Sequence, residues 1–389
     1  MLQTNTLVIG GGPAGSTTAR YLSGMGIETI LVERDLSYIK PCGGGIPSPV
    51  FQEFSIPNSV IKKEVGKIRI VTPKEERIDV ELKGGHLCIT DRGDFDSKLR
   101  EMAKNSGALI IEGEFIRFEE LNKNIISIIR KKATNEEIRI KSNYVVASDG
   151  ITFKVGAAVK IPKHDYLHTI SAHIKPIVSA SSNESGKGTG EGDMCEFWFG
   201  SQNASYFYSW IFHSAEYYSI GTGTTNPKEL TKLLDRFLRR RFNESLEVFS
   251  EKNFLGKPRA FKIPLWHGAP LNVKNIFFVG DAAGAVMPLT YEGIYYAMKS
   301  GEFAATAIKE GNPKIYKKLW NGRFRNRFLL MSKIKNYFFK SDENIEKWLL
   351  IHKKPEVQEI AMRLFLKKES KSGSLISYIN CFRHLFKKT

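Results

Sequence analysis

Residues 6–15 read TLVIGGGPAG, an apolar run that leads into three glycines, Pro13, Ala14 and a fourth glycine. A helical pattern follows as far as Leu22, and residues 28–35, ETILVERD, form a second apolar run that ends in acidic residues. Strand, glycine turn, helix and strand in this order are typical of the first unit of a dinucleotide-binding parallel sheet. We therefore expect an α/β protein, α+β overall, whose first domain is Rossmann-like.

The spacing of the glycines supports this expectation. Gly10, Gly12 and Gly15 match the pattern GxGxxG, and Glu33 lies 23 residues after the first of them. Two glycines of this pattern let the chain turn and approach a pyrophosphate, and the third lets the helix and strand pack closely. The helix N-terminus would face the phosphates, and Glu33 would accept hydrogen bonds from a ribose. A glycine turn without a ligand is the weaker interpretation.

Three further segments extend the domain. Residues 107–118 predict a strand, and residues 124–140 predict a hairpin with its turn near 133–136, which leads into NYVVASDG at 143–150. Residues 275–284, NIFFVGDAAG, predict a second buried strand followed at once by a helix start. Asp281 could bind a hydroxyl group of a cofactor there, and the amides of the helix could bind anionic oxygens.

Segments rich in strand formers lie between these pieces. Their alternation and their aromatic residues predict one antiparallel sheet that covers the cofactor. These segments are KIRIVTP (67–73), HTISAHIKPI (168–177), MCEFWFG (194–200), SYFYSWIFH (205–213) and YYSIGTG (217–223). Residues 179–193 are polar and glycine-rich, which predicts a loop.

Composition bounds the class of protein. The 389 residues are 42% hydrophobic and 25% charged, which is typical of a globular protein with a large core. No apolar run reaches 18 residues, and no basic region precedes the N-terminal apolar run, so we expect neither a spanning helix nor a signal peptide. Four scattered cysteines without metal-ligand spacing predict reduced thiols and no metal site. We expect a cytoplasmic monomer.

The C-terminal region carries most of the net charge of +17. From Pro313 onward there are 19 Lys and Arg residues against 6 Asp and Glu, a net charge of +13. Bulky side chains are interleaved with them: Trp320, Phe324, Phe328, Leu329, Phe338, Phe339, Trp348 and Phe365. One interpretation is a helical region at the inner face of the membrane, its cations on anionic lipid and its aromatic residues in the bilayer. The other is a helical cap with buried aromatic residues and solvated charges. No nucleic-acid motif accompanies the charge.

The motifs together resemble a known framework. GGGPAG, Glu33–Arg34, Arg92 in TDRGDFDSKL, Asp149–Gly150 and GDAAG resemble the FAD-binding framework of flavin-dependent aromatic hydroxylases and geranylgeranyl reductases, over most of residues 1–312. The resemblance implies noncovalent FAD held by Gly10, Gly12, Ala14, Gly15, Glu33, Arg34, Cys42, Gly43, Gly44, Arg92, Asp149, Gly280, Asp281, Gly293 and Ile294. Two of these residues also have a structural interpretation, Arg92 as a surface charge at a helix start and Asp149 as a turn residue.

Three segments are most similar to the geranylgeranyl reductase family, which reduces isolated C=C bonds of polyprenyl chains. They are KPCGGGIP (40–47), SYFYSWIFH (205–213) and GDAAGAVMPLTYEGIYYAMKSG (280–301). The family motif PxxYxWxFP is only partly kept, because Ser205 and His213 replace its prolines. In PLTYEGI the usual glycine is replaced by Tyr291.

The resemblance implies a catalytic set of Cys42, Tyr208 and Trp210. Tyr208, Trp210 and Phe212 at a spacing of two would lie on one face of a strand, either as an apolar wall for an isoprenoid or as ordinary core packing. Hydride addition to an alkene leaves a carbon that needs a proton. A thiol or a chain of water molecules could supply this proton. Cys42, which the resemblance places beside the flavin, is the candidate thiol; the alternative is that Cys42 is only a small buried residue.

The sequence thus predicts an FAD-dependent reductase of a polyprenyl chain on a lipid, a quinone or a prenyl diphosphate. Two alternatives stay open, an FAD-dependent monooxygenase and a membrane-associated electron-transfer flavoprotein. NADPH and a reduced ferredoxin-type protein are both open as electron donors. The predicted domains are an FAD-binding domain (1–65, 89–160 and 256–312), a substrate-binding β-sheet domain (66–88 and 161–255) and a basic helical region (313–389).

Overall fold

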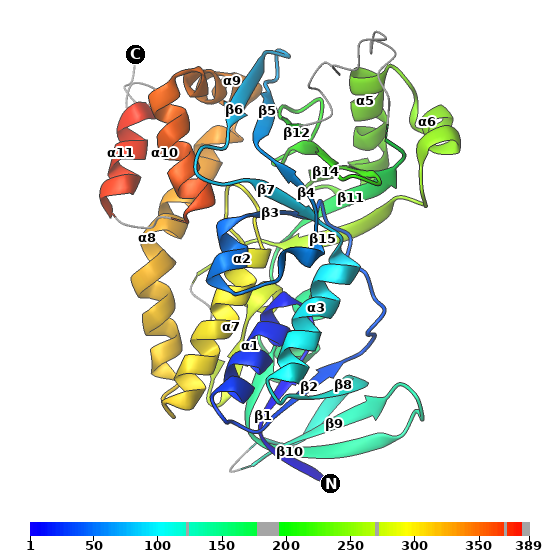
Figure 1. The fold of residues 1–389 in the computed structure, drawn as a ribbon, viewed down its shortest axis with the longest axis vertical. Coiled ribbons are helices and arrows are strands. Elements are labelled where there is room, and N and C mark those ends of the chain that lie inside the picture. Colours follow the sequence, from blue (N-terminus) through cyan, green and yellow to red (C-terminus); the bar gives the residue numbers. More distant parts are fainter. Residues whose placement is uncertain (122–123, 177–193, 269–271, 369–371, 383–389) are drawn as a thin grey trace. The chain divides into compact units, whose positions relative to one another are not determined.

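The computed structural model describes residues 1–121, 124–176, 194–268, 272–368 and 372–382 (Figure 1). The predicted loop at 179–193 lies outside these residues. None of the described helices combines the length and apolar character that a membrane-spanning helix needs.

The chain divides into two compact units, each made of three segments. The first unit comprises Met1–Ile39, Gly93–Tyr166 and Ile263–Met331, and the second comprises Lys40–Arg92, Leu167–Lys262 and Ser332–Thr389. This division differs from the predicted domains most at two places, and the other boundaries shift by only a few residues. Residues 40–65 belong to the second unit because strands there pair with Leu87–Thr90, and the basic C-terminal region is shared by both units.

The first unit is built on a seven-stranded sheet in the order β1-β2-β8-β9-β10-β17-β16, with β1 also paired to β10. Its strands are β1 (Leu2–Ile9), β2 (Thr29–Glu33), β8 (Leu109–Leu121), β9 (Ile125–Lys131), β10 (Glu137–Ala147), β16 (Asn272–Val273) and β17 (Ile276–Phe278). β1 runs parallel to β2 and β10, and β10 runs parallel to β17. Their carboxyl ends therefore lie at one edge, where ligands bind in such sheets. The predicted hairpin is β9–β10, and the α/β fold class is confirmed.

Helices α1 (Pro13–Gly24), α3 (Arg92–Asn105), α4 (Lys154–Ala158) and α7 (Ile294–Lys309) belong to this unit, with most of α8 (Lys314–Phe338). Small residues let α1 and α7 approach closely, since a Cβ atom on Gly301 would lie 2.6 Å from the carbonyl oxygen of Ala14. This contact fixes the start of α1 and hence the position of the glycine turn before it.

The second unit contains a seven-stranded sheet in the order β15-β11-β14-β13-β12-β5-β6. The strands are β5 (Lys67–Val71), β6 (Arg77–Glu81), β11 (Tyr166–Ile174), β12 (Met194–Trp198), β13 (Ser209–His213), β14 (Tyr218–Thr224) and β15 (Arg259–Pro264). All five predicted strands are present, but the expectation of a wholly antiparallel sheet is wrong, because β12 pairs with β5 in parallel. A second, small sheet joins β3 (Gly45–Pro47), β7 (Leu87–Thr90) and β4 (Ile61–Val65), and α2 (Pro49–Glu53) follows β3.

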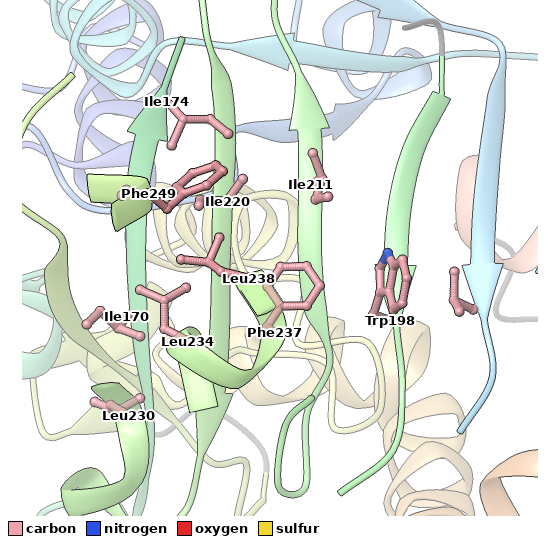
Figure 2. Close-up of a cluster of buried hydrophobic side chains, with 12 residues drawn as sticks. Ile170, Ile174, Trp198, Ile211, Ile220, Leu230, Leu234, Phe237, Leu238 and Phe249 are labelled. Carbon is pink, nitrogen blue, oxygen red and sulfur yellow. The ribbon is translucent and has the colours of Figure 1, made fainter. Parts of the chain in front are cut away.

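One face of the large sheet is covered by α5 (Leu230–Phe242) and α6 (Leu246–Asn253), as Figure 2 shows. Ile211 of β13 packs there with Phe237 and other side chains of the two helices. Because side chains alternate along a strand, Trp210 and Phe212 lie on the opposite face of β13. That face is therefore available for another role.

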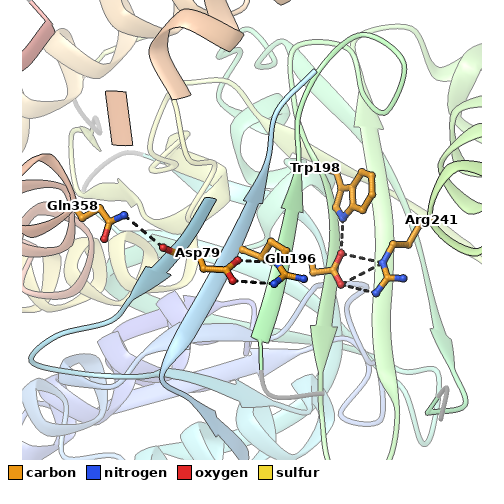
Figure 3. A network of polar contacts seen from close by, with 6 residues as sticks. Asp79, Glu196, Trp198, Arg241 and Gln358 are labelled. Carbon is orange, nitrogen blue, oxygen red and sulfur yellow. Dashed lines mark hydrogen bonds and ion pairs between the residues drawn. The ribbon is translucent and has the colours of Figure 1, made fainter. Parts of the chain in front are cut away.

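A partly buried ion pair links α5 to the sheet (Figure 3). The carboxylate of Glu196 accepts hydrogen bonds from Arg241 at 2.8 Å and from the indole nitrogen of Trp198 at 2.6 Å. Burial alone would raise the pKa of Glu196, but the hydrogen bonds and charge of Arg241 lower it overall. Figure 3 also shows Gln358 of α10 (Pro355–Leu366), whose amide donates to the carbonyl of Asp79 at 3.5 Å.

The described part of the C-terminal region is helical, as predicted: α8, α9 (Asp342–Leu350), α10 and α11 (Ser372–Phe382). The prediction that its aromatic side chains enter lipid is wrong for most of them. Trp320, Phe324 and Phe328 are fully buried. The ring centroid of Trp320 lies 5.1 Å from that of Phe324 and 5.3 Å from that of Phe328. Phe338, Phe339 and Trp348 are also buried, Phe365 is half-buried and Leu329 is exposed. The aromatic residues are core.

Candidate functional site

The turn after β1 requires glycine at two positions for the packing of the protein itself. Gly10 has a φ of +108°, and a Cβ atom on it would lie 2.2 Å from the carbonyl oxygen of Ser148. A Cβ atom on Gly15 would lie 1.9 Å from the carbonyl oxygen of Gly10. Any side chain at either position would force the turn apart.

Gly12 is different, because nothing in the described protein requires glycine there. Its φ of −75° suits any residue, and a Cβ atom on it would meet no heavy atom within 4 Å. Gly12 is also the N-cap of α1, and it has no side chain to cap the first amides of the helix. Open space in front of uncapped amides fits the phosphate of a dinucleotide.

Glu33 at the end of β2 lies beside this turn. Its Oε2 accepts a hydrogen bond from the amide of Gly11 at 2.5 Å, and its Oε1 accepts one from the amide of Asp35 at 3.1 Å. Both bonds fix the carboxylate at the carboxyl edge of the sheet, next to the predicted ribose position. Arg34 follows, exposed, with its guanidinium 5.6 Å from the ring of Tyr38.

Arg100 of α3 is a site residue that the sequence did not reveal. Its buried guanidinium donates to the carbonyl oxygen of Gly11 at 3.3 Å and to that of Leu36 at 2.9 Å. It therefore braces the glycine turn against the segment after β2. No motif marks Arg100, which looks like any charged residue of an amphipathic helix.

Asp149, after the end of β10, is brought to the same turn. A Cβ atom on Gly10 would lie 2.9 Å from the Asp149 amide nitrogen, and the Oδ2 atom of Asp149 accepts from the amide of Val155 at 3.0 Å. Its Oδ1 atom is buried without a hydrogen-bond partner among the described residues. Burial raises the pKa of Asp149 to about 6. A buried oxygen of this kind suits a site in which a bound ligand donates a hydrogen bond to it.

The GDAAG segment forms the 3₁₀ turn η5 (Gly280–Ala283) after β17. The helix expected directly after it is absent from the described residues, since α7 begins only at Ile294, with Gly293 as its N-cap. The two segments still meet, because a Cβ atom on Gly293 would lie 3.7 Å from an Asp281 carboxylate oxygen. Burial raises the pKa of Tyr166, and the charges of Asp281 and Asp149 add to this.

Tyr291 occupies the position where the resemblance leads one to expect glycine. Its φ is +55°, in the left-handed region that favours glycine, and its side chain is buried. Burial also raises the pKa of its hydroxyl. The loop before α7 thus keeps a glycine-like backbone while holding a large side chain.

The remaining predicted residues belong to the second unit. A Cβ atom on Gly43 would lie 2.6 Å from the Phe212 ring and 3.2 Å from the indole nitrogen of Trp210. Gly44 has a φ of +78°, and a Cβ atom on it would lie 2.3 Å from the carbonyl oxygen of Thr90. The KPCGGGIP loop is therefore pressed onto the face of β13 that the helices leave free.

Cys42 within this loop is a half-buried free thiol whose Sγ atom lies 3.4 Å from the amide of Gly44. Ser219, which the sequence did not reveal, donates to the carbonyl oxygen of Cys42 at 3.4 Å and accepts from Trp210 Nε1 at 3.4 Å. A serine within an ordinary strand pattern carries no signal of such a bridge.

The predicted aromatic row is shorter than expected. Trp210 and Phe212 are buried on one face of β13, with ring centroids 6.5 Å apart. Tyr208 precedes the strand and is half-buried, with its ring 5.3 Å from that of Phe197. Arg92 is buried, so its interpretation as a surface charge is wrong.

The fold and the glycine turn define a dinucleotide-binding flavoprotein. The chain belongs to the FAD-binding domain family, whose match extends over residues 3–308, and FAD as the cofactor is thereby confirmed. The open position at Gly12 and the unpartnered oxygen of Asp149 fit this group.

Relatives confirm the resemblance to geranylgeranyl reductases. The chain is 28% identical over 379 residues to a geranylgeranyl diphosphate reductase of Rhodobacter capsulatus, which covers 95% of this chain and 93% of that protein. It is 27% identical over 401 residues to a digeranylgeranylglycerophospholipid reductase of Thermoplasma acidophilum, covering 93% and 95%. A solved geranylgeranyl bacteriochlorophyll reductase-like protein of that organism superposes with a TM-score of 0.80, at 24% identity and with 98% and 100% coverage, and shows the same fold.

Proposed function

We propose that this protein is an FAD-dependent reductase that saturates C=C bonds of a polyprenyl chain of the geranylgeranyl type, carried on a lipid, a quinone or a prenyl diphosphate. The observation that carries the proposal is the packing of the cysteine loop onto Trp210 and Phe212 in an FAD-binding chain. The activities in the names of the Rhodobacter and Thermoplasma relatives support this substrate class.

When bound and reduced, FAD supplies the hydride for an isolated alkene. Gly12 leaves room for the pyrophosphate, and the amides at the start of α1 point into that room. Trp210 and Phe212 offer an apolar surface that suits an isoprenoid and excludes water. Cys42 carries its thiol on the loop that contacts this surface.

An anaerobic reaction tests the proposal. Protein reduced with dithionite and mixed with a polyprenyl lipid should give a product heavier by one pair of hydrogens per reduced bond, detected by mass spectrometry, while its flavin is reoxidised. A monooxygenase would give no product until oxygen is admitted, and an electron-transfer flavoprotein would reduce an added quinone and leave every alkene intact. Either result would overturn the proposal.

The electron donor needs a separate measurement. Stopped-flow absorbance of the oxidised flavin, mixed anaerobically with NADPH or with a reduced ferredoxin-type protein, distinguishes the two. The physiological electron donor should reduce the flavin, and so remove its absorbance, at least as fast as the enzyme turns over.

A further inference from the structure

The outward face of α8 carries an unusual distribution of charge. The helix contains eight Lys and Arg residues and no Asp or Glu. Four of the cations recur at helical spacing on its exposed side: Lys314, Lys318, Arg325 and Lys333, which we call the cationic stripe. None of the four forms an ion pair with the described residues. Over 25 residues the helix is about 37 Å long, so the stripe is a line rather than a spot.

Several exposed cations elsewhere are paired with acids. Lys132 contacts both Asp35 and Glu112, Arg139 contacts Glu119, and Lys154 contacts Glu114. At these sites the positive charge is neutralised locally, whereas along this face of α8 it is not, because the helix contains no Asp or Glu. A line of unpaired cations is complementary to an anionic plane.

The opposite face of α8 determines how such a contact would work. Trp320, Phe324 and Phe328 are fully buried within the protein and cannot enter a bilayer. Within the described residues of α8, Leu329 is the one large apolar side chain that is exposed. The attraction must therefore be almost wholly electrostatic, without the apolar contribution that salt does not screen.

We infer that the cationic stripe of α8 is a docking surface for anionic phospholipid headgroups, which holds the enzyme reversibly on the membrane. The inference rests on the proposed function, because a polyprenyl substrate carried on a lipid resides in the bilayer. It deepens that function by naming the surface through which the enzyme reaches its substrate.

Co-sedimentation of the FAD-loaded full chain with vesicles tests this inference. Vesicles of phosphatidylcholine with phosphatidylglycerol should bind the protein, and vesicles of phosphatidylcholine alone should not. Raising the salt concentration to about 0.5 M should abolish binding, because charges are then screened within a few ångströms. Binding to neutral vesicles, or binding that survives this salt, would overturn the inference.

Charge reversal locates the surface. K314E/K318E/R325E/K333E should weaken binding to anionic vesicles by at least about a hundredfold, since each cation near such a surface contributes roughly fivefold. The matched control K83E/K104E/K163E/K252E changes the net charge equally through four exposed lysines on other elements, and should retain most of the binding. Equal losses in both variants would show bulk charge instead of a docking surface.

Two further readouts separate the possible failures. Both variants should keep their flavin and reduce a detergent-solubilised polyprenyl lipid at the wild-type rate, because the stripe lies outside the FAD and cysteine-loop residues. If the wild-type protein does not reduce the lipid, the proposed reductase function is wrong, but the result of the vesicle-binding test still holds. Preferential binding of a labelled oligonucleotide through the stripe, with no binding to anionic vesicles, would assign it to nucleic acid and overturn the inference.

Discussion

A Cβ atom on Gly15 would lie 1.9 Å from the carbonyl oxygen of Gly10, whereas a Cβ atom on Gly12, between them in sequence, would touch nothing within 4 Å. Two glycines of one motif are therefore required by the packing of the protein, and the third, Gly12, leaves open space that we expect the ligand to use. This difference can be measured.

Gly12→Val should fold like the wild type and bind FAD at least about tenfold more weakly, because the side chain fills space that the pyrophosphate needs. Gly15→Val is the contrasting variant and should lose folded structure, because its side chain would collide with the backbone of the turn. Flavin absorbance per chain and circular dichroism check both. A Gly12→Val protein that retains stoichiometric flavin would contradict the assignment of this position.

Asp149 should make the stability of the cofactor-free protein depend on pH. Its pKa is about 6 in the folded state against an ordinary value of 3.8, so the folded protein holds a proton that the unfolded chain has released. The free energy of unfolding should therefore fall as pH rises from about 4 to about 6, by up to about 3 kcal/mol, and then stay level. Asp149→Asn should remove this decline in denaturant titrations. Parallel pH curves for both proteins would exclude the raised pKa.

Cys42→Ser should bind FAD normally and reduce an isolated alkene at least about tenfold more slowly, because a hydroxyl is a far weaker acid than a thiol. The measurement is the single-turnover rate at which a polyprenyl substrate reoxidises the reduced flavin. Reoxidation by oxygen, which needs no proton transfer to carbon, serves as the control and should change little. An unchanged alkene rate would remove Cys42 from the catalytic set.

Gly43→Ala should lower the free energy of unfolding by about 1–3 kcal/mol, because its new methyl group would lie 2.6 Å from the Phe212 ring. Phe212→Leu removes the edge of that ring, so the same glycine substitution should cost clearly less in the Phe212→Leu background. Denaturant unfolding of the two single variants and the double variant gives the coupling. Strict additivity would mean that the loop and β13 do not touch.

Trp320→Ala should destabilise the protein by about 3–5 kcal/mol, because the indole is fully buried among Phe324 and Phe328. Leu329→Ala on the same helix is the matched control and should stay within about 0.5 kcal/mol, since Leu329 is 39% exposed. Thermal unfolding of both variants checks this. A mild effect at Trp320 would revive the idea that these aromatic residues serve a membrane.

Local patterns predicted the fold well because they record local physics. The strand, glycine turn and helix from β1 to α1 follow from residue spacing, and alternation located β5 and β11 to β14. Pairing partners are not local, so the parallel pairing of β12 with β5 had no signal. The segment at 280–283 has the small residues of a helix start, but Gly280 at a φ of +60° and Gly284 at +61° turn the chain instead.

The sequence can propose site residues where a residue type is itself the signal, as with Gly12 and Cys42, and both stay predictions. Residues that act by reaching across the structure were missed, because Arg100 in a helix and Ser219 in a strand look ordinary in sequence. The C-terminal region shows a different limit of prediction from sequence. Aromatic residues at helical spacing define an apolar face, but the pattern is the same whether lipid or protein covers it.

The glycine turn also constrains when the protein can become functional during its synthesis. Ser148 closes against Gly10, and Gly280 closes against Ala14, so the turn is assembled from segments far apart in the chain. A nascent chain whose β17 is still inside the ribosome lacks one wall of the turn. Its β1 can pair with β2 early, but it lacks its second parallel neighbour until β10 has emerged. We therefore expect the cofactor to bind only after these segments have assembled. Until then the apolar N-terminal strand of the growing chain is exposed to wrong partners.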